Sequence, residues 1–251
     1  DSTLGLHADI VTSTNKTLQY CLKNDLAINP TKTTQINFSR RQDQVPNVQN
    51  ITIEKQSKLL GIVIDGDLTW TDHINSLTKK LGSGIYAVRR IKWIGGLQAA
   101  KTTYHAVFES HIRYGISVWG GTSAHNLSKI LLLQKKAIRT LADLGPLESC
   151  REAFKTLKLM TVIALYIYSV VVQTVEMELP RAKDTHSHNT RRATDYLLPG
   201  HHTTRYSRKP SYMGRKIFNT LPLNLKNLGG NEMKKSLQAW LMERPFYTMT
   251  E

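Results

Sequence analysis

The residues of this sequence best suited to chemistry are clusters of lysine and arginine with tyrosines among them. The clusters fall in residues 79–92, 135–139 and 181–216. Lysine and arginine bind phosphate oxygens, and exposed tyrosine rings stack on nucleobases. Any one of these cations alone is better explained as a solvated charge, but their clustering predicts contact with nucleic acid. The cations are Lys79, Lys80, Arg89, Arg90, Lys92, Lys135, Lys136, Arg139, Arg191, Arg192, Arg205 and Arg208, and the tyrosines are Tyr196, Tyr206 and Tyr212.

Two carboxylates lie close together in the segment Ile64-Asp65-Gly66-Asp67. A pair of carboxylates can hold Mg²⁺. Aspartate is also common in turns and at helix starts, where it accepts hydrogen bonds from backbone amides, and we favour this structural role. The four histidines at positions 186, 188, 201 and 202 lie in a basic segment with few carboxylates or thiols. We therefore expect solvated or phosphate-facing imidazoles there instead of zinc ligands.

No complete enzyme signature is present. The sequence has no Gly-x-x-x-x-Gly-Lys loop, no Gly-x-Ser-x-Gly turn and no His-Glu-x-x-His helix. Two cysteines, Cys21 and Cys150, are too few for a disulfide framework or a four-cysteine zinc site, so we expect buried, unreactive thiols and a reduced, intracellular setting. The longest apolar stretch, around Val162–Val172, is shorter than the ~20 residues that cross a bilayer, so no membrane partner is expected.

Charge is distributed unevenly along the 251 residues, whose formal net charge is +15. Residues 1–75 contain 7 Lys/Arg and 8 Asp/Glu (7 − 8 = −1), whereas residues 76–251 contain 27 and 11 (27 − 11 = +16). Basic proteins are sometimes basic for solubility alone. Confinement of the whole excess to one part instead favours a polyanionic partner, because that part attracts nucleic acid and releases its counterions.

Two kinds of structure must position these side chains. Before residue 66 the pattern is mixed, and we expect three short strands with a helix beside them, a unit too small to be comfortably stable alone. The predicted segments are a helix at Asp9–Asn24, strands at Thr33–Ser39, Ile51–Glu54 and Lys58–Asp65, and a hairpin-like connection at Arg40–Asn50.

From Thr69 onward the apolar residues recur with a helical period. The stripe formed by Trp70, Ile74, Leu77, Leu81, Ile85 and Val88 predicts a helix that ends at Gly95-Gly96. Further helices are predicted at Leu97–Tyr114, Ser123–Leu141, Ser149–Leu157, Val162–Met177, Tyr212–Leu221 and Met233–Glu243. Arg181–Lys216 has almost no apolar period and is predicted to be extended and basic. The fold class we predict is α+β, a small antiparallel sheet followed by a mostly helical bundle.

Several short motifs occur in a fixed order along the chain. They are Asp1-Ser2-Thr3-Leu4, Leu26-Ala27-Ile28-Asn29-Pro30-Thr31-Lys32-Thr33, Lys58-Leu59-Leu60-Gly61-Ile62-Val63-Ile64-Asp65, Leu68-Thr69-Trp70 with His73-Ile74, Ser110-His111-Ile112-Arg113-Tyr114-Gly115, Trp119-Gly120, Gln134-Lys135-Lys136-Ala137, Ser149-Cys150-Arg151 and His188-Asn189-Thr190-Arg191. Each motif is weak alone. Their order and spacing resemble the reverse transcriptases of non-LTR (LINE-type) retrotransposons, the jockey-like elements in particular, over almost the whole chain.

The resemblance implies a division into the end of a palm (1–66), a helical thumb (67–180) and a basic C-terminal segment with closing helices (181–251). It implies that Asp1 is one of three catalytic aspartates that bind two Mg²⁺ ions. It further implies that Lys32 assists near the leaving pyrophosphate and that Leu60-Gly61 is the hairpin that supports the primer end. The other two aspartates and the fingers would lie upstream.

The function we expect from this resemblance is that of a C-terminal part of an RNA-directed DNA polymerase. It would bind RNA–DNA or DNA duplex as partner, together with the upstream palm and fingers, and would be inactive alone. Mg²⁺ is expected in the intact polymerase and no cofactor in the isolated part. A non-catalytic basic scaffold for ribonucleoprotein particles and a degraded element copy stay open as alternatives. Localisation is unknown, although the family role would place the protein in the nucleus during integration.

Overall fold

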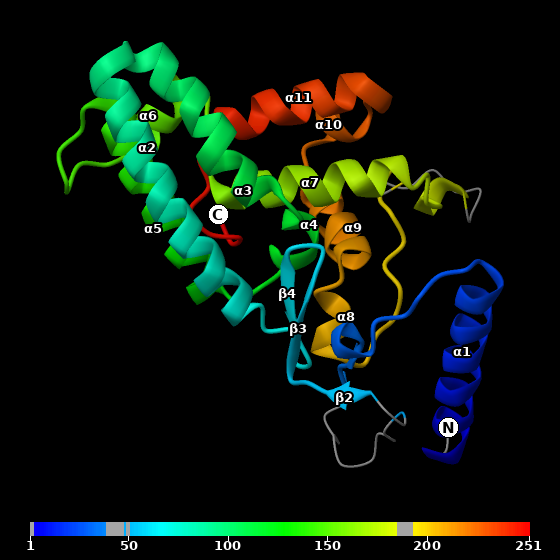
Figure 1. Cartoon of the computed structure of the whole chain (residues 1–251). Coiled ribbons are helices and arrows are strands. Elements are labelled where there is room, and N and C mark those ends of the chain that lie inside the picture. Colours follow the sequence, from blue (N-terminus) through cyan, green and yellow to red (C-terminus); the bar gives the residue numbers. More distant parts are fainter. Residues whose placement is uncertain (1–2, 39–47, 49–50, 185–192) are drawn as a thin grey trace. The chain divides into compact units, whose positions relative to one another are not determined.

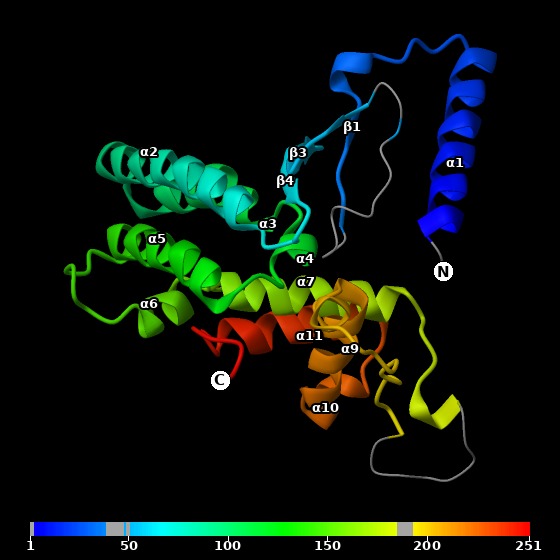
Figure 2. The ribbon, with the colours of Figure 1, turned by 90° about the horizontal axis from the view of Figure 1, so that it is seen from below.

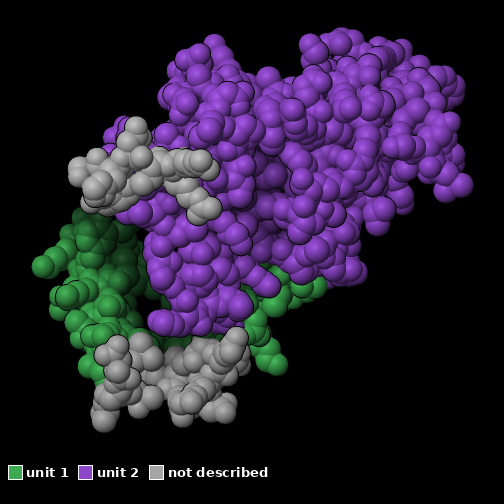
Figure 3. Space-filling view, turned by 180° about the vertical axis from the view of Figure 1, so that it is seen from behind, with its two compact units in different colours: residues 1–73 green, residues 74–251 purple. Residues whose placement is uncertain are grey.

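The computed structural model describes residues 3–38, 48, 51–184 and 193–251. The chain forms two compact units, Asp1–His73 and Ile74–Glu251 (Figure 3). Helices dominate, and the described strands form two small two-stranded sheets, which confirms the predicted α+β class (Figure 1). The boundary between the units falls where the sequence changes from nearly neutral to strongly basic. Unit 1 therefore carries the net charge of −1 and unit 2 the net charge of +16.

Unit 1 begins with the long helix α1, which starts earlier than the expected Asp9. A short 3-10 turn, η1, follows, capped by the Asn29 side chain, which accepts a hydrogen bond from the Thr31 amide at 3.0 Å. The elements of this unit are α1 (Thr3–Lys23), η1 (Pro30–Lys32), β1 (Thr34–Gln35), β2 (Thr52–Ile53), β3 (Gln56–Leu59) and β4 (Ile62–Asp65).

The first sheet differs from the prediction in direction and in extent. β1 pairs with β2 in parallel, so the expectation of a purely antiparallel sheet is wrong. Only Thr34–Gln35 of the expected strand Thr33–Ser39 is paired, because β2 offers just two residues as its partner. Ser39 and nearly all of the expected connection Arg40–Asn50 lie outside the described residues.

The second sheet is an antiparallel hairpin of β3 and β4. The apolar run Lys58–Asp65, expected to be one strand, reverses at Leu60 and Gly61, whose φ angles are 47° and 84°. Positive φ at both central residues is the geometry of a tight two-residue hairpin turn. Periodicity could not reveal this turn, because an apolar leucine occupies its first position.

Asp65 is a structural residue. Its carboxylate accepts hydrogen bonds from the backbone amides of Asp67 (3.1 Å), Thr69 (2.9 Å) and Trp70 (2.9 Å). These bonds fix the loop that leads into α2 (Thr71–Thr103), as expected for an aspartate at a helix entry. The structure therefore confirms the predicted structural role of the Asp65–Asp67 pair in a turn before a helix.

Unit 2 is a helical bundle whose first half closely follows the predicted periods. α2 is broken at Gly96, where φ is 72°, so its first helix ends at the predicted glycine pair. The predicted helix Leu97–Tyr114 is present, but its middle is a π-helix, η3 (Tyr104–Glu109). The further elements are α3 (Ser110–Arg113), α4 (Ile116–Trp119), α5 (Ala124–Ala142), α6 (Arg151–Thr156), α7 (Val162–Glu176), η4 (Ala182–Asp184), α8 (Thr204–Ser207), α9 (Pro210–Thr220), α10 (Leu223–Lys226) and α11 (Gly230–Met242).

Helix α7 is the centre of this bundle. It contacts α3, α4, α5, α9 and α11, and Figures 1 and 2 show these helices grouped around it. Eight of its residues are buried, as expected for a helix that is apolar on most sides. α9 approaches closely at Gly214, where a Cβ would collide with the Thr174 hydroxyl and the Val170 carbonyl. The predicted helix Tyr212–Leu221 is therefore confirmed as α9, which begins two residues earlier. The expectation that residues 181–216 are extended is wrong for Thr204–Ser207, which form α8.

The predicted core is confirmed. All six residues of the Trp70–Val88 stripe are buried, and so is the inner face of α5, formed by Leu127, Ile130, Leu131, Ile138 and Leu141. The Ser123 hydroxyl caps α5 by accepting a hydrogen bond from the Asn126 amide at 3.3 Å. Among the described residues, no helix is both long enough and apolar enough to cross a membrane.

Candidate nucleic-acid interface

A groove of unit 2 lies between the part of α2 before Gly96 and the C-terminal half of α5, with a volume of about 870 Å³. We call it the α2–α5 groove. Four of its lining side chains are basic and one is acidic (Asp143). The lining residues are Ile85, Arg89, Lys92 and Trp93 from α2, Lys136, Arg139 and Thr140 from α5, and Asp143, Leu144 and Pro146 beyond it.

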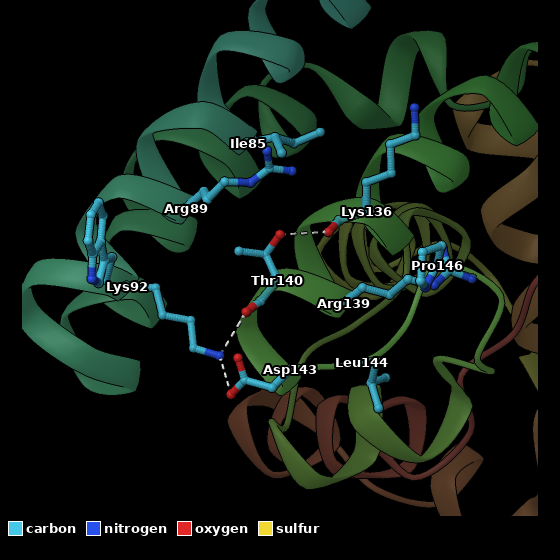
Figure 4. Close-up of a pocket in the computed structure, with 10 residues that line it drawn as sticks. Ile85, Arg89, Lys92, Lys136, Arg139, Thr140, Asp143, Leu144 and Pro146 are labelled. Atoms are coloured by element: carbon cyan, nitrogen blue, oxygen red, sulfur yellow. Dashed lines mark hydrogen bonds and ion pairs between the residues drawn. The ribbon is translucent and has the colours of Figure 1, made fainter.

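Lys92 supports the groove structurally. Its ammonium group donates hydrogen bonds to the carbonyls of Thr140 and Leu141, both at 2.8 Å, and pairs with the Asp143 carboxylate at 2.5 Å (Figure 4). These carbonyls are in the last turn of α5, where they lack intrahelical partners and where a cation is favourable. The Lys92 side chain is only 15% exposed. Lys92 therefore ties α2 to the end of α5.

Two other predicted cations on α5 also have partners within the protein. The Arg139 guanidinium donates to the Glu148 carbonyl from Nε (3.2 Å) and Nη2 (3.0 Å). The Lys135 ammonium lies 3.6 Å from the centre of the Tyr247 ring. Burial lowers the pKa of Lys135, and the nearby Arg139 lowers it further, opposed by Cys150. Lys135 thus contacts Tyr247 and does not line the groove.

Arg89 and Lys136 are the two exposed cations of the groove. Arg89 extends from α2 into the space facing α5, and Lys136 rises from α5 on the other side (Figure 4). An extended cation on each wall is a suitable arrangement for holding phosphate oxygens of a strand that lies between them.

Trp93 completes the groove lining with an indole that is 81% exposed. The Arg90 guanidinium carbon lies 5.7 Å from the centre of the Trp93 ring, within cation–π range. The groove thus combines basic side chains with an exposed aromatic face.

Among the described residues, the other predicted cations do not line this groove. Lys79 and Lys80 are exposed on α2, and Arg208 is exposed beside α8, while Arg205 is half-buried within α8. Arg191 and Arg192 lie outside the described residues. The structure therefore brings together only Arg89, Lys92, Lys136 and Arg139 from the predicted set.

The tyrosines predicted to stack on bases are largely packed within the protein. Tyr196 is 4% exposed, and its ring contacts Phe218 with a centroid distance of 4.7 Å, so it cannot serve as an exposed platform. Tyr206 and Tyr212 are half-buried and pack against His201, with centroid distances of 5.8 and 4.7 Å.

The predicted catalytic positions belong to unit 1. Lys32 is exposed at the end of η1, and Leu60 is 80% exposed at the β3–β4 turn together with Gly61. Asp1 lies outside the described residues. Within the described part of the chain, no group of three or more His, Cys, Asp or Glu residues could hold a metal ion.

Trp93 is the groove residue that the sequence analysis missed, although a signal for it existed. The buried stripe of α2 ends at Val88, and its next position four residues later is Lys92. The same period that turns Lys92 inward places Trp93 off the buried face. A tryptophan next to basic residues and outside the apolar stripe would have marked this position.

Comparison with known proteins relates the chain to polymerases of mobile elements. It is 28% identical over 138 residues to a probable RNA-directed DNA polymerase from transposon BS and 26% identical over 128 residues to the RNA-directed DNA polymerase from mobile element jockey, both of Drosophila melanogaster. These regions cover 49% and 47% of this chain, but only 15% and 14% of the relatives. No protein-family model and no solved structure matches the chain. The chain therefore contains a region like the reverse transcriptases of non-LTR retrotransposons, similar over about half its length to the jockey-type polymerases.

Proposed function

We propose that unit 2 binds the sugar–phosphate backbone of a primer–template duplex, preferring RNA–DNA hybrid, as the thumb and C-terminal part of an RNA-directed DNA polymerase. The observation that carries this proposal is the α2–α5 groove, with the exposed cations Arg89 and Lys136 on opposite walls. The net charge of +16 on unit 2 and the similarity to two RNA-directed DNA polymerases support it.

The electrostatics favour binding to phosphates over binding to a small neutral ligand. Each Lys or Arg that neutralises a phosphate releases condensed counterions, so affinity falls as salt rises, with a log–log slope of about −0.9 per contact on duplex DNA. Lys92 and Arg139 are engaged with α5 and the following loop. Arg89 and Lys136 are therefore the groove residues whose removal should change this slope.

The test is a salt titration of binding to a short RNA–DNA hybrid by the double variant Arg89→Ala with Lys136→Ala. We expect weaker binding and a slope smaller by about 2. The matched control is Lys216→Ala with Lys235→Ala, which removes two exposed charges from α9 and α11, outside the groove lining. An equal loss in both variants would mean that binding has no localised site, the behaviour of a generic basic scaffold.

The second part of the proposal concerns catalysis. Residues 1–251 alone should not extend a primer, because the resemblance assigns them one of the three metal-binding aspartates, Asp1, and two-metal catalysis needs the full carboxylate set. Mg²⁺ belongs in this proposal to the intact polymerase. Templated synthesis by this chain alone, with Mg²⁺ and nucleotides, would refute this part while leaving duplex binding to be judged separately.

A further inference from the structure

The feature without a role so far is the exposed indole of Trp93. A tryptophan side chain contributes strongly to stability when buried, yet this one is 81% exposed. It lies in the lining of a basic groove, four residues after Arg89 on the same helix. This position supplies a flat aromatic face in the same groove as Arg89, the side chain that the proposed function assigns to phosphate.

The groove has room for one or two unpaired nucleotides beside the duplex backbone that the proposed function assigns to Arg89 and Lys136. Its volume of about 870 Å³ is within the range of pockets that hold compact organic molecules, ~300–1,000 Å³. A base pair inside a duplex has both faces covered by its neighbours and presents mainly phosphates to a protein. An unpaired base has a free face that can stack on an aromatic side chain while Arg89 or Lys136 holds its phosphate.

We infer that Trp93 is a stacking site for an unpaired base, so that the α2–α5 groove, whose Arg89 and Lys136 contact the duplex backbone, also takes the first unpaired nucleotide of an overhang that continues from that duplex. This inference rests on the proposed function, because the duplex would be held by the same unit. The stacking site adds a preference for duplexes whose overhang carries bases. The cations alone would respond only to the additional phosphates of the overhang.

The experiment compares three versions of one short RNA–DNA hybrid by fluorescence anisotropy with the full chain. One is blunt, one has a short single-stranded overhang, and one has the same overhang with abasic residues, which keep the phosphates but lack the bases. We expect the native chain to bind the base-bearing overhang most tightly. Trp93→Ala should weaken binding to that ligand about tenfold, within the range of ~5–150-fold that one stacked base represents, and leave the other two unchanged.

Two further variants serve as controls. Trp93→Phe keeps an aromatic face and should retain most of the preference. Tyr86→Ala removes another exposed aromatic of α2, which is 67% exposed and does not line the groove, and it should change none of the three affinities. Unchanged binding of Trp93→Ala to the blunt hybrid also shows that the variant is folded.

The outcomes separate this inference from the proposed function. Equal affinity of the native chain for the base-bearing and abasic overhangs, or equal weakening of all three ligands by Trp93→Ala, would overturn the stacking site. If the chain binds none of the duplexes, or if Arg89→Ala with Lys136→Ala binds like the native chain, the proposed function fails first and the inference fails with it.

Discussion

The lysines that line the α2–α5 groove have different roles, and the groups around each lysine determine its role. Lys92 is on the inner stripe of α2 and caps the carbonyls of α5, whereas Lys136 is exposed on α5. The sequence predicts nucleic-acid contact for both, because each belongs to a cluster of basic residues on or after the polar side of its helix. The helical period distinguishes the two lysines. Lys92 follows the buried Val88 by four residues, so the aliphatic part of its side chain packs into the bundle.

Replacing Lys92 should therefore reduce stability. Lys92→Ala removes two hydrogen bonds from a charged donor and an ion pair at the end of α5. We expect a loss of about 1.5–3 kcal/mol in the free energy of unfolding, measured by urea denaturation. Lys136→Ala, the matched control, should change it by less than about 0.5 kcal/mol. Equal stabilities of the two variants would show that the Lys92 contacts contribute nothing net.

The two cysteines should differ in reactivity. Cys150 is 1% exposed, and burial raises the pKa of its thiol, with Arg139 and Lys135 opposing that shift, so it stays protonated and inert at neutral pH. Cys21 is half-exposed, which corrects the expectation that both are buried. A thiol-specific reagent at neutral pH should label one cysteine in the native chain and both in denaturant. Loss of the native signal in Cys21→Ser identifies the site, whereas rapid labelling of Cys150 would contradict the packing.

At the scale of elements, the sequence predicted helices well and strands poorly, for a physical reason. A helix of several turns repeats its apolar position many times, so Ile74 to Val88 defines one face without ambiguity. β1 and β2 contain two paired residues each, too few to establish a period. Their parallel pairing depends on contacts between segments far apart in the chain, which local sequence does not encode.

Two glycines of α2 should respond in opposite directions to the same substitution. Gly96 breaks the helix with φ of 72°, a conformation that disfavours a Cβ, whereas Gly82 is helical and has open space around its Cα. Gly96→Ala should destabilise the protein by ~1–3 kcal/mol, because φ of 72° with ψ of −170° is a conformation essentially restricted to glycine. Gly82→Ala should stabilise it by about 0.5–1 kcal/mol, because alanine is the better helix former. Thermal unfolding measures both, and a destabilising Gly82→Ala would contradict the open surroundings described here.

At the scale of the whole molecule, the division of charge coincides with the division into units. Composition alone placed the change between residues 75 and 76, and the compact units separate after His73. The groove could not be predicted in the same way, because it forms where α2 and α5, about 50 residues apart, pack together. Charge composition thus identifies the strongly basic part of the chain, and tertiary packing determines which of its cations remain exposed.

The two units should also differ in local stability. Within the described part of unit 1, only Gly66, Trp70 and His73 are buried, and no described side chain of α1 is, whereas α7 buries eight residues. Helices gain most of their stability from packing an apolar face, so α1 should open far more often than α7. Native-state hydrogen exchange by mass spectrometry should show fast exchange in peptides from residues 3–23 and slow exchange, close to the global limit, in peptides from α5 and α7. Because exchange reports opening of backbone hydrogen bonds, protection of α1 as strong as that of α7 would require a buried face that the described residues of unit 1 do not have.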